Sequence, residues 1–140
     1  MCIIGMVSCT TAEKKTKILD EGGSGPYKAM GISEPTLKGL TVYRPQNLQA
    51  AVNGEGKSLP LMVFANGGCS DSNAQHWRML TDIASYGYVI IALGELQDSI
   101  NDRQHGKTEN ADMIKALDWA EMQTNEASSE YADIIDMQNV

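Results

Sequence analysis

The sharpest change from apolar to polar residues in the chain falls within positions 59–73. Six of the seven residues from Leu59 to Ala65 are apolar, and the run stops at Asn66-Gly67-Gly68. A continuous apolar run of this length predicts a strand that is buried on both faces, and such strands usually lie in parallel sheets covered by helices. The loop that follows therefore begins at the carboxyl end of a buried strand, where α/β folds place their sites.

The next two segments complete a unit of strand, helix and strand. Residues 74–85 have the spacing of an amphipathic helix, which Ser72 or Asn73 would cap. Residues 88–93 form a second apolar run, typical of another doubly buried strand. Such a unit crosses over right-handed in nearly all proteins, so it predicts two parallel strands and the α/β class. The apolar stripe of the helix is Trp77, Leu80, Ile83 and Ala84.

The patterns elsewhere are weaker. Residues 36–45 alternate in part and end at Pro45, which predicts a strand nearer the edge of the sheet. Residues 47–58 contain several turn formers and are interpreted as a connector. A further helix is expected with Thr108 as its cap, and residues 134–140 would approach another strand. The apolar face of that helix would hold Met113, Leu117 and Ala120, with Ile114 and Trp119 near it.

The first residues have a different character. Residues 1–8 are almost wholly apolar, and Met6-Val7-Ser8-Cys9 resembles a bacterial lipobox, in which the cysteine is acylated. The pattern predicts a lipoprotein signal remnant over residues 1–8, a flexible tether over residues 9–24, and an extracytoplasmic protein held at the membrane through lipidated Cys9. The alternative is an apolar N-terminus without a targeting role, in a secreted or cytoplasmic protein. The folded domain is expected over residues 25–140.

Composition and charge narrow the classes of function. The chain has 140 residues, at most one domain, and 11 basic against 18 acidic residues give a net charge of −7. Phosphate binding needs a basic face, so nucleic acid is not expected as a partner. No glycine-rich nucleotide motif follows a strand, so no cofactor is predicted. No metal site is predicted either, because the spacing of the candidates is not that of a preformed ligand set. These candidates are Asp71, Asp98, Asp102 and His105.

Five segments, taken in order, match a known family. They are Gly-Pro-Tyr at 25–27, Leu-Thr-Val-Tyr-Arg-Pro at 40–45, and residues 59–69, 83–90 and 135–140. Together they resemble the N-terminal half of an α/β-hydrolase, and most closely the branch of dienelactone hydrolases, cutinases and polyester hydrolases. The resemblance covers residues 25–140. It implies a three-layer α/β/α domain with a mostly parallel sheet, truncated before the strand that carries the nucleophile.

The resemblance assigns a role to the loop at the carboxyl end of the first apolar run. In the family, the loop after the third strand supplies a backbone N–H to the oxyanion hole. Gly68 or Cys69 would donate this N–H, and Asn66, Gly67 and Ser70 would form the rim of the substrate cleft. Acyl transfer builds negative charge on a carbonyl oxygen, and one fixed amide donor stabilises it by roughly 3 kcal/mol. Taken alone, these residues are as consistent with a tight turn that has only a structural role.

The catalytic residues of the family do not occur in these 140 positions. The sequence has no Gly-x-Ser-x-Gly, and Val140 falls where the fifth strand would begin, so the nucleophile, acid and base are expected after Val140. The resemblance implies the N-terminal part of a serine carboxylic-ester hydrolase, inactive alone, for a small-molecule or polymeric ester. The chain would be a fragment or come from a partial gene. The alternative is a non-catalytic extracytoplasmic binding protein with the same fold.

Five side chains have chemistry that this assignment does not use. His76 and His105 could serve as bases, but the order of the triad places the base downstream, so both are interpreted as polar rim residues. Cys69 could be a thiol nucleophile only with a partner base. Trp77 and Trp119 lie at helical spacing among apolar neighbours, which favours a place in the core.

Overall fold

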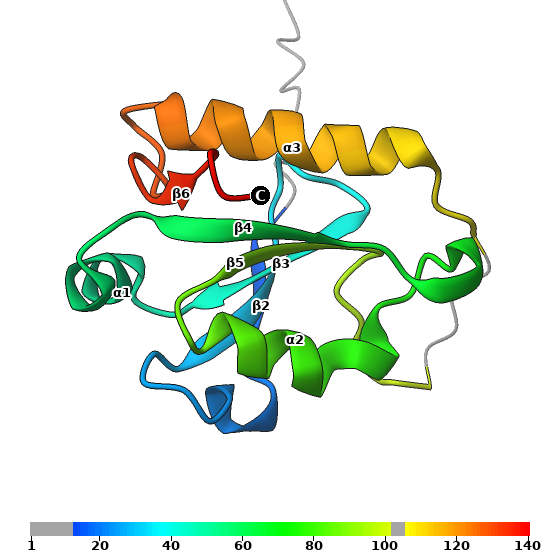
Figure 1. Ribbon diagram of the computed structural model, residues 1–140. Helices are drawn as coiled ribbons and strands as arrows, with labels where there is room; N and C mark the ends of the chain where they lie inside the picture. The colour runs from blue at the N-terminus through cyan, green and yellow to red at the C-terminus, as the bar shows by residue number, and fades with distance from the viewer. Residues whose placement is uncertain (1–12, 102–105) are drawn as a thin grey trace, which may run out of the picture.

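A computed structural model describes residues 13–101 and 106–140, which form one six-stranded sheet with helices on both faces (Figure 1). The strands are β1 (Lys15–Lys17), β2 (Ala29–Ser33), β3 (Leu40–Pro45), β4 (Leu59–Phe64), β5 (Val89–Leu93) and β6 (Ile135–Asp136). The helices are α1 (Leu48–Glu55), α2 (Trp77–Ala84) and α3 (Asn110–Asn125), and three short 3-10 turns are η1 (Asp20–Gly22), η2 (Gly67–Cys69) and η3 (Ala74–His76).

The strands lie in the order β1-β2-β3-β5-β4-β6. The pairs β1 with β2, β2 with β3 and β3 with β5 are antiparallel, whereas β4 is parallel to both β5 and β6. The short connection from β2 to β3 returns the chain directly and gives an antiparallel pair, while α2 carries the chain from β4 to β5 and gives a parallel one. The α/β class is confirmed, but the sheet is mixed rather than mostly parallel.

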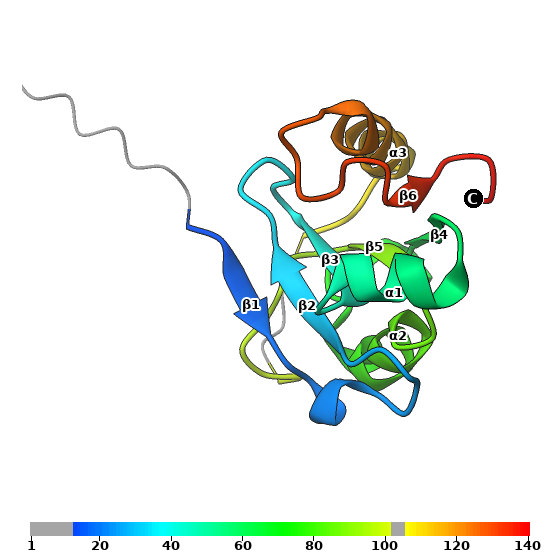
Figure 2. The same ribbon diagram turned by 90° about the vertical axis from the view of Figure 1, so that its left-hand side faces the viewer.

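Helix α3 covers one face of the sheet and α2 covers the other (Figures 1 and 2). The central strand β5 contributes to both cores. Val89, Ile91 and Leu93 pack in the core with α3, and Ile90 and Ala92 pack in the core with α2. Because helices cover both faces of the sheet, no side chain of β5 faces solvent, which explains the uninterrupted apolar run in its sequence. The prediction of a doubly buried strand is therefore confirmed for residues 89–93, whereas Tyr88 precedes the strand and is exposed.

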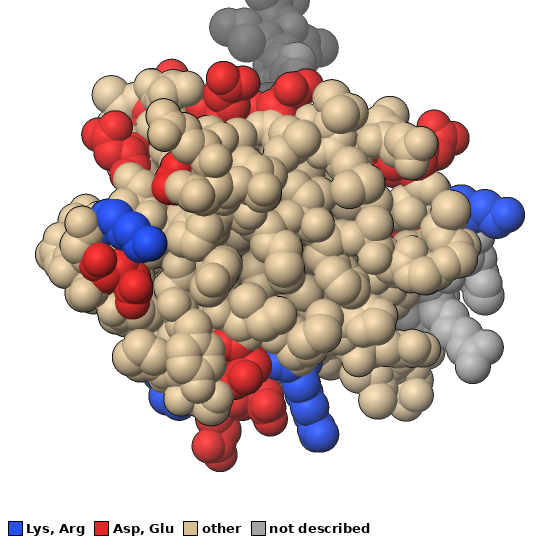
Figure 3. Space-filling view, viewed as in Figure 1, with Lys and Arg blue, Asp and Glu red and all other residues tan. Residues whose placement is uncertain are grey.

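Strand β4 is less deeply buried than its sequence predicts. Leu59 and Leu61 are buried, but Met62, Val63 and Phe64 are half-buried. On one side of β4 the residues 61–64 pair with β5, whereas β6 pairs only with the first two residues on the other side. From Met62 onward this edge pairs with no strand of the described chain. Figure 3 views the molecule from this side and shows no charged side chain in the middle of the face.

Strand β3 lies inside the sheet, which corrects the prediction that it is nearer the edge. It is flanked by β2 and β5, and all six of its residues are buried. Pro45 is its last residue and lies opposite Ala29, so the proline ends the ladder without requiring an open edge. The polar side chains of the strand are satisfied by internal hydrogen bonds, which an alternation pattern does not reveal.

Residues 47–58, interpreted as a connector, contain helix α1. The Asn47 side chain caps this helix by accepting a hydrogen bond from the Ala50 N–H at 2.9 Å. Gly56 ends it in the left-handed conformation, as is common for a glycine after the last helical turn. The turn formers that suggested a connector are thus the cap residues of a short helix.

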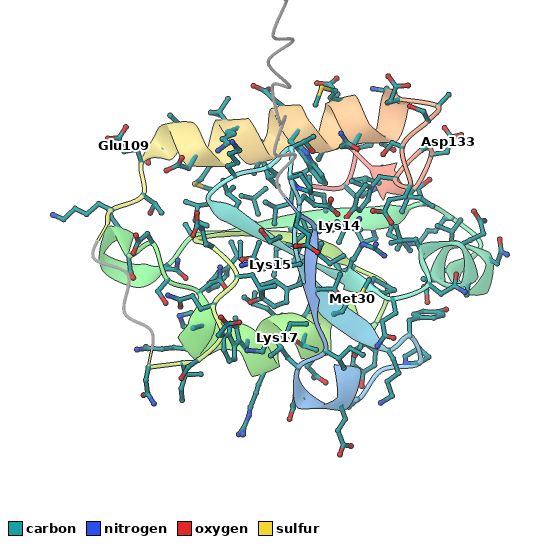
Figure 4. The ribbon with its side chains drawn as sticks, turned by 180° about the vertical axis from the view of Figure 1, so that it is seen from behind. Lys14, Lys15, Lys17, Met30, Glu109 and Asp133 are labelled. Atoms are coloured by element: carbon teal, nitrogen blue, oxygen red, sulfur yellow. The ribbon has the colours of Figure 1, made fainter. Side chains whose placement is uncertain are left out.

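Residues 13–24 are folded against the sheet, in contrast to the predicted flexible tether. Residues 15–17 form β1, which pairs antiparallel with β2. Lys14 Nζ lies 3.1 Å from a carboxylate oxygen of Glu34. Figure 4, drawn from behind, shows the three labelled lysines following this strand. Backbone pairing and ion pairs hold this polar segment against the sheet. Neither interaction produces an apolar pattern in the sequence, so the segment was predicted to be flexible.

Residues 1–12 are outside the described residues, and with them Cys9 and the signal remnant predicted over residues 1–8. Lipidation at Cys9 therefore stays a prediction. No helix in the described part of the chain combines the length and apolarity that a bilayer span requires.

Helix α3 begins at Asn110 and is capped by Glu109 rather than by Thr108. The Glu109 side chain accepts the N–H of Asp112, and the Asp112 carboxylate accepts the N–H of Glu109 at 2.8 Å. This reciprocal pair is a capping box, in which two unpaired donors at the helix start are satisfied together. The buried residues of the helix are Ala116, Trp119 and Ala120, with Met113 and Leu117 packed half-buried against the same core.

Candidate functional site

The loop between β4 and η3, residues 65–73, lies where the parallel strands β4 and β5 both end (Figure 1). Phe64 at the end of β4 pairs with Ala92, and Leu93 ends β5. In α/β folds the carboxyl ends of parallel strands are the usual location of binding and catalytic sites. We call residues 65–73 the site loop.

The backbone of the site loop turns sharply through η2. Gly68 and Cys69 have φ values of 66° and 57°, a region that glycine adopts readily and cysteine rarely. The Ser70 N–H donates to the carbonyl of Gly67 at 3.3 Å. Outside this turn, the N–H groups of Gly68 and Cys69 bond to no other group of the described chain, and Cys69 is an exposed free thiol. Gly68 and Cys69, whose amides are the predicted donors, are therefore exposed residues at the rim of the sheet.

The Asn66 side chain fixes the start of the site loop. Its Nδ2 donates to the carbonyl of Ser70 at 2.9 Å and to the carbonyl of Leu93 at 2.8 Å. The first bond closes the loop on itself, and the second attaches it to the end of β5. Asn66 is 8% exposed, and its Oδ1 is buried without a hydrogen-bond partner. The residue is thus held by its two donor hydrogens, while its acceptor is unused.

The Asn73 side chain fixes the other end of the site loop from a fully buried position. Its Nδ2 donates to the carbonyls of Leu93 and Gly94 at 3.1 and 3.0 Å. Its Oδ1 accepts the hydroxyl hydrogen of Tyr43 at 2.7 Å. Burial of this hydroxyl raises the pKa of Tyr43 above its usual value. The expected helix-capping bond is not made, because the amide points into this network.

A second segment crosses the site loop. The Thr108 N–H donates to the carbonyl of Cys69 at 2.9 Å, and Lys107 pairs antiparallel with Ser70. Beneath the loop, Gly94 has a φ of 105°, and a Cβ there would lie 2.1 Å from the carbonyl oxygen of Asp71. Only glycine lets the loop pass this close to the end of β5. The site loop is therefore held between β5 and the segment that leads to α3.

A small polar pocket of about 190 Å³ opens beside the site loop. His76 is on its wall, and the His76 ring meets the Phe64 ring edge-on with the centroids 5.1 Å apart. The backbone of Gly67 and the hydroxyls of Ser70 and Ser72 supply hydrogen-bonding groups to a ligand of modest size. The residues that line the pocket are Asn66, Gly67, Ser70, Ser72, Gln75 and His76.

The structure brings together part of the predicted site. The rim residues Asn66, Gly67 and Ser70 line the pocket, whereas Gly68 and Cys69 lie in the adjoining turn and do not line it. His105 is outside the described residues. Sequence reasoning did not identify the roles of Ser72, Gln75 and Asn73, since their contacts depend on where β5 ends. The sequence did single out Asn73, but as a cap of the following helix and not as a residue that binds the end of β5.

The other candidate residues have structural roles. Asp71 accepts the N–H of Gly106 at 3.0 Å, and no group of three metal-ligating side chains occurs among residues 13–101 and 106–140. Trp119 is 4% exposed in the core with α3, as predicted. Trp77 is half-buried against the core with α2, and Lys17 Nζ lies 4.4 Å from its ring centroid. Trp77 therefore only partly matches the predicted core position.

No protein-family model matches this sequence, and a search of curated proteins finds no match.

Proposed function

We propose that this chain is the N-terminal part of a serine carboxylic-ester hydrolase of the α/β-hydrolase superfamily, and that its site loop supplies the oxyanion-hole donor. The observation that carries the proposal is the position of Gly68 and Cys69 at the carboxyl ends of β4 and β5, where both residues are exposed and their amides make no hydrogen bond outside their turn within the described chain. Amides held in place before the reaction stabilise charge without reorganising as it develops, which is the main requirement of an oxyanion hole.

The direction of the last residues supports the same proposal. The strand β6 runs parallel to β4, and the Leu61 N–H donates to the carbonyl of Asn139 at 3.1 Å. A strand rises about 3.3 Å per residue, so about four more residues would take a chain on this course from Leu61 to the level of Ala65. A nucleophile elbow at that point would stand beside the site loop. The unpaired and uncharged edge of β4 leaves room for such a strand.

The proposed mechanism uses the site loop in one step. A serine oxygen from the following polypeptide attacks the ester carbonyl carbon while a histidine base removes the hydroxyl proton. As the new carbon–oxygen bond forms, the carbonyl π electrons move onto the carbonyl oxygen. The N–H of Gly68 or Cys69 donates to this oxygen, and such a donor contributes roughly 3 kcal/mol to the stabilisation of the transition state.

The test compares two polypeptides, the 140-residue chain and the product that includes the sequence encoded after Val140. We expect no turnover of short-chain p-nitrophenyl esters by the first and serine-dependent turnover by the second. A Cys69→Ser variant of the shorter chain controls for hydrolysis by the exposed thiol. Esterase activity of the 140-residue chain that survives this substitution would contradict the proposal. A following sequence without a Gly-x-Ser-x-Gly elbow would favour the non-catalytic binding protein instead.

A further inference from the structure

We infer that Asn66 and Asn73 are positioning residues that fasten both ends of the site loop to a single acceptor, the carbonyl oxygen of Leu93. The two Nδ2 atoms lie 2.8 and 3.1 Å from this oxygen. The role in catalysis rests on the proposed function, whereas the fastening itself can be tested separately. A carbonyl oxygen has two lone pairs and can accept both bonds.

The second hydrogen of each amide extends the attachment in a different direction. Asn66 also donates to the Ser70 carbonyl, so it holds the loop in its turned conformation. Asn73 also donates to the Gly94 carbonyl, so it holds the loop against the backbone that follows β5. The segment between them contains the amides of Gly68 and Cys69. Their positions are therefore determined by β5, a strand in which every residue is buried.

The chemistry of Asn66 indicates that its donors are the reason for its place in the loop. Its Oδ1 is buried without a partner, an arrangement that normally costs free energy. A neutral amide supplies two donors to two carbonyls and introduces no charge near the predicted oxyanion. An aspartate of the same shape would instead place an acceptor-only carboxylate opposite both carbonyl oxygens.

The test measures the order of the site loop in solution by ¹⁵N relaxation of the 140-residue chain. In the unmodified chain we expect order parameters of Gly67, Gly68 and Cys69 near those of rigid backbone, about 0.85, and in Asn66→Ala we expect values below about 0.6. Asn66→Asp should have an effect at least as large. Helix α3 should be unchanged in both variants. Asn53→Ala is the matched control, since Asn53 is an exposed asparagine whose side chain bonds only Gln49.

Hydrogen exchange gives a second measure of the same loop. The Thr108 N–H donates to the Cys69 carbonyl, so it reports whether the turn is in place. Its exchange should accelerate about tenfold in Asn66→Ala, as expected when a hydrogen bond that holds the turn is lost. Unchanged order parameters and unchanged Thr108 exchange in a folded variant would overturn the inference.

One measurement needs no substitution and therefore remains decisive if a variant does not fold. The side-chain Nδ2 hydrogens of Asn66 and Asn73 should exchange with water at least tenfold more slowly than those of exposed Asn53, because they are donated to backbone carbonyls and both side chains are buried. Equal rates at the three positions would show that the fastening does not exist. None of these measurements uses an ester, so they separate this inference from the proposed esterase activity.

Discussion

Two polar clusters lie on opposite faces of β3, and one is charged while the other is neutral. Tyr43 and Arg44 are neighbours in this strand, so their side chains point to opposite faces. The amide cluster lies toward α2 and consists of Thr41, Tyr43, Asn66 and Asn73 with the carbonyls of Leu93 and Gly94. The ion cluster lies toward α3 and consists of Lys14, Glu34, Arg44, Glu130 and Tyr131.

The ion cluster joins segments that are far apart in the sequence. Arg44 is 3% exposed, and its guanidinium donates to Glu130 at 2.8 Å and to the Tyr131 hydroxyl at 3.1 Å. The same hydroxyl donates to Glu34, which is 7% exposed and paired with Lys14. Two cations and two carboxylates balance one another here. The cluster thus attaches β1 and the segment after α3 to the sheet.

The amide cluster holds the site loop without a formal charge. A fixed charge beside an oxyanion hole would change the field that the amide donors create, since electrostatic interactions are strong in a partly buried site. Charged side chains therefore join segments in the ion cluster, whereas neutral amides hold the two ends of the site loop. Substitutions in the ion cluster and in the amide cluster should therefore differ in their cost to stability.

The largest effect is expected in the ion cluster. Arg44→Ala should lower the free energy of unfolding by about 3 kcal/mol, because it leaves a cavity where a buried side chain packed and removes a donor to the buried Tyr131 hydroxyl. Urea denaturation followed by circular dichroism measures this loss. Arg78→Ala is the control, since the Arg78 side chain is 89% exposed and its loss should cost less than about 0.5 kcal/mol. Equal losses in the two variants would show that the ion cluster contributes nothing to stability.

An intermediate effect is expected in the amide cluster. Asn73→Ala should lower the free energy of unfolding by about 2 kcal/mol, because the buried Tyr43 hydroxyl and the Gly94 carbonyl lose a partner. The same denaturation experiment measures it, with Asn53→Ala as the exposed control. A loss no greater than that of the control would mean that water reaches the amide cluster and replaces the hydrogen bonds of the Asn73 side chain.

The smallest effect is expected at the rim of the ion cluster. The Lys14 side chain is 35% exposed, so Lys14→Ala should cost less than about 1 kcal/mol, and the cost should fall further at high salt. Thermal unfolding at low and high ionic strength measures both. A loss as large as that of Arg44→Ala would show that β1 is held mainly by this lysine and not by its pairing with β2.

The sequence predicted those elements whose pattern is set by local burial. The strand at 89–93 and the helix at 77–84 each pack directly against a core, so the spacing of their apolar residues shows which positions are buried. Helix α1 was missed because its boundary residues, Asn47 and Gly56, are turn formers and its apolar face is short. The inner position of β3 was missed because partial alternation and Pro45 indicated an edge strand, whereas its polar side chains are hydrogen-bonded inside the protein.

The sequence predicted only those residues of the candidate site that lie next to a predicted strand in the chain. Asn66, Gly67 and Ser70 were identified because they follow a buried strand directly. The contribution of Asn73 was not, since its partners belong to β3 and to the end of β5. The crossing of the site loop by residues 106–108 likewise depends on a pairing between segments more than thirty positions apart. A single sequence contains no pattern from which such contacts follow.

The two edges of the sheet differ in their capacity to accept a further strand. Strand β1 is short and carries Lys15 and Lys17, and charged side chains of this kind discourage pairing with another strand. On the opposite side, β6 pairs only with the first two residues of β4, and β4 has no charged side chain from Met62 onward. Addition of a strand is therefore expected beside β4 and β6 rather than beside β1.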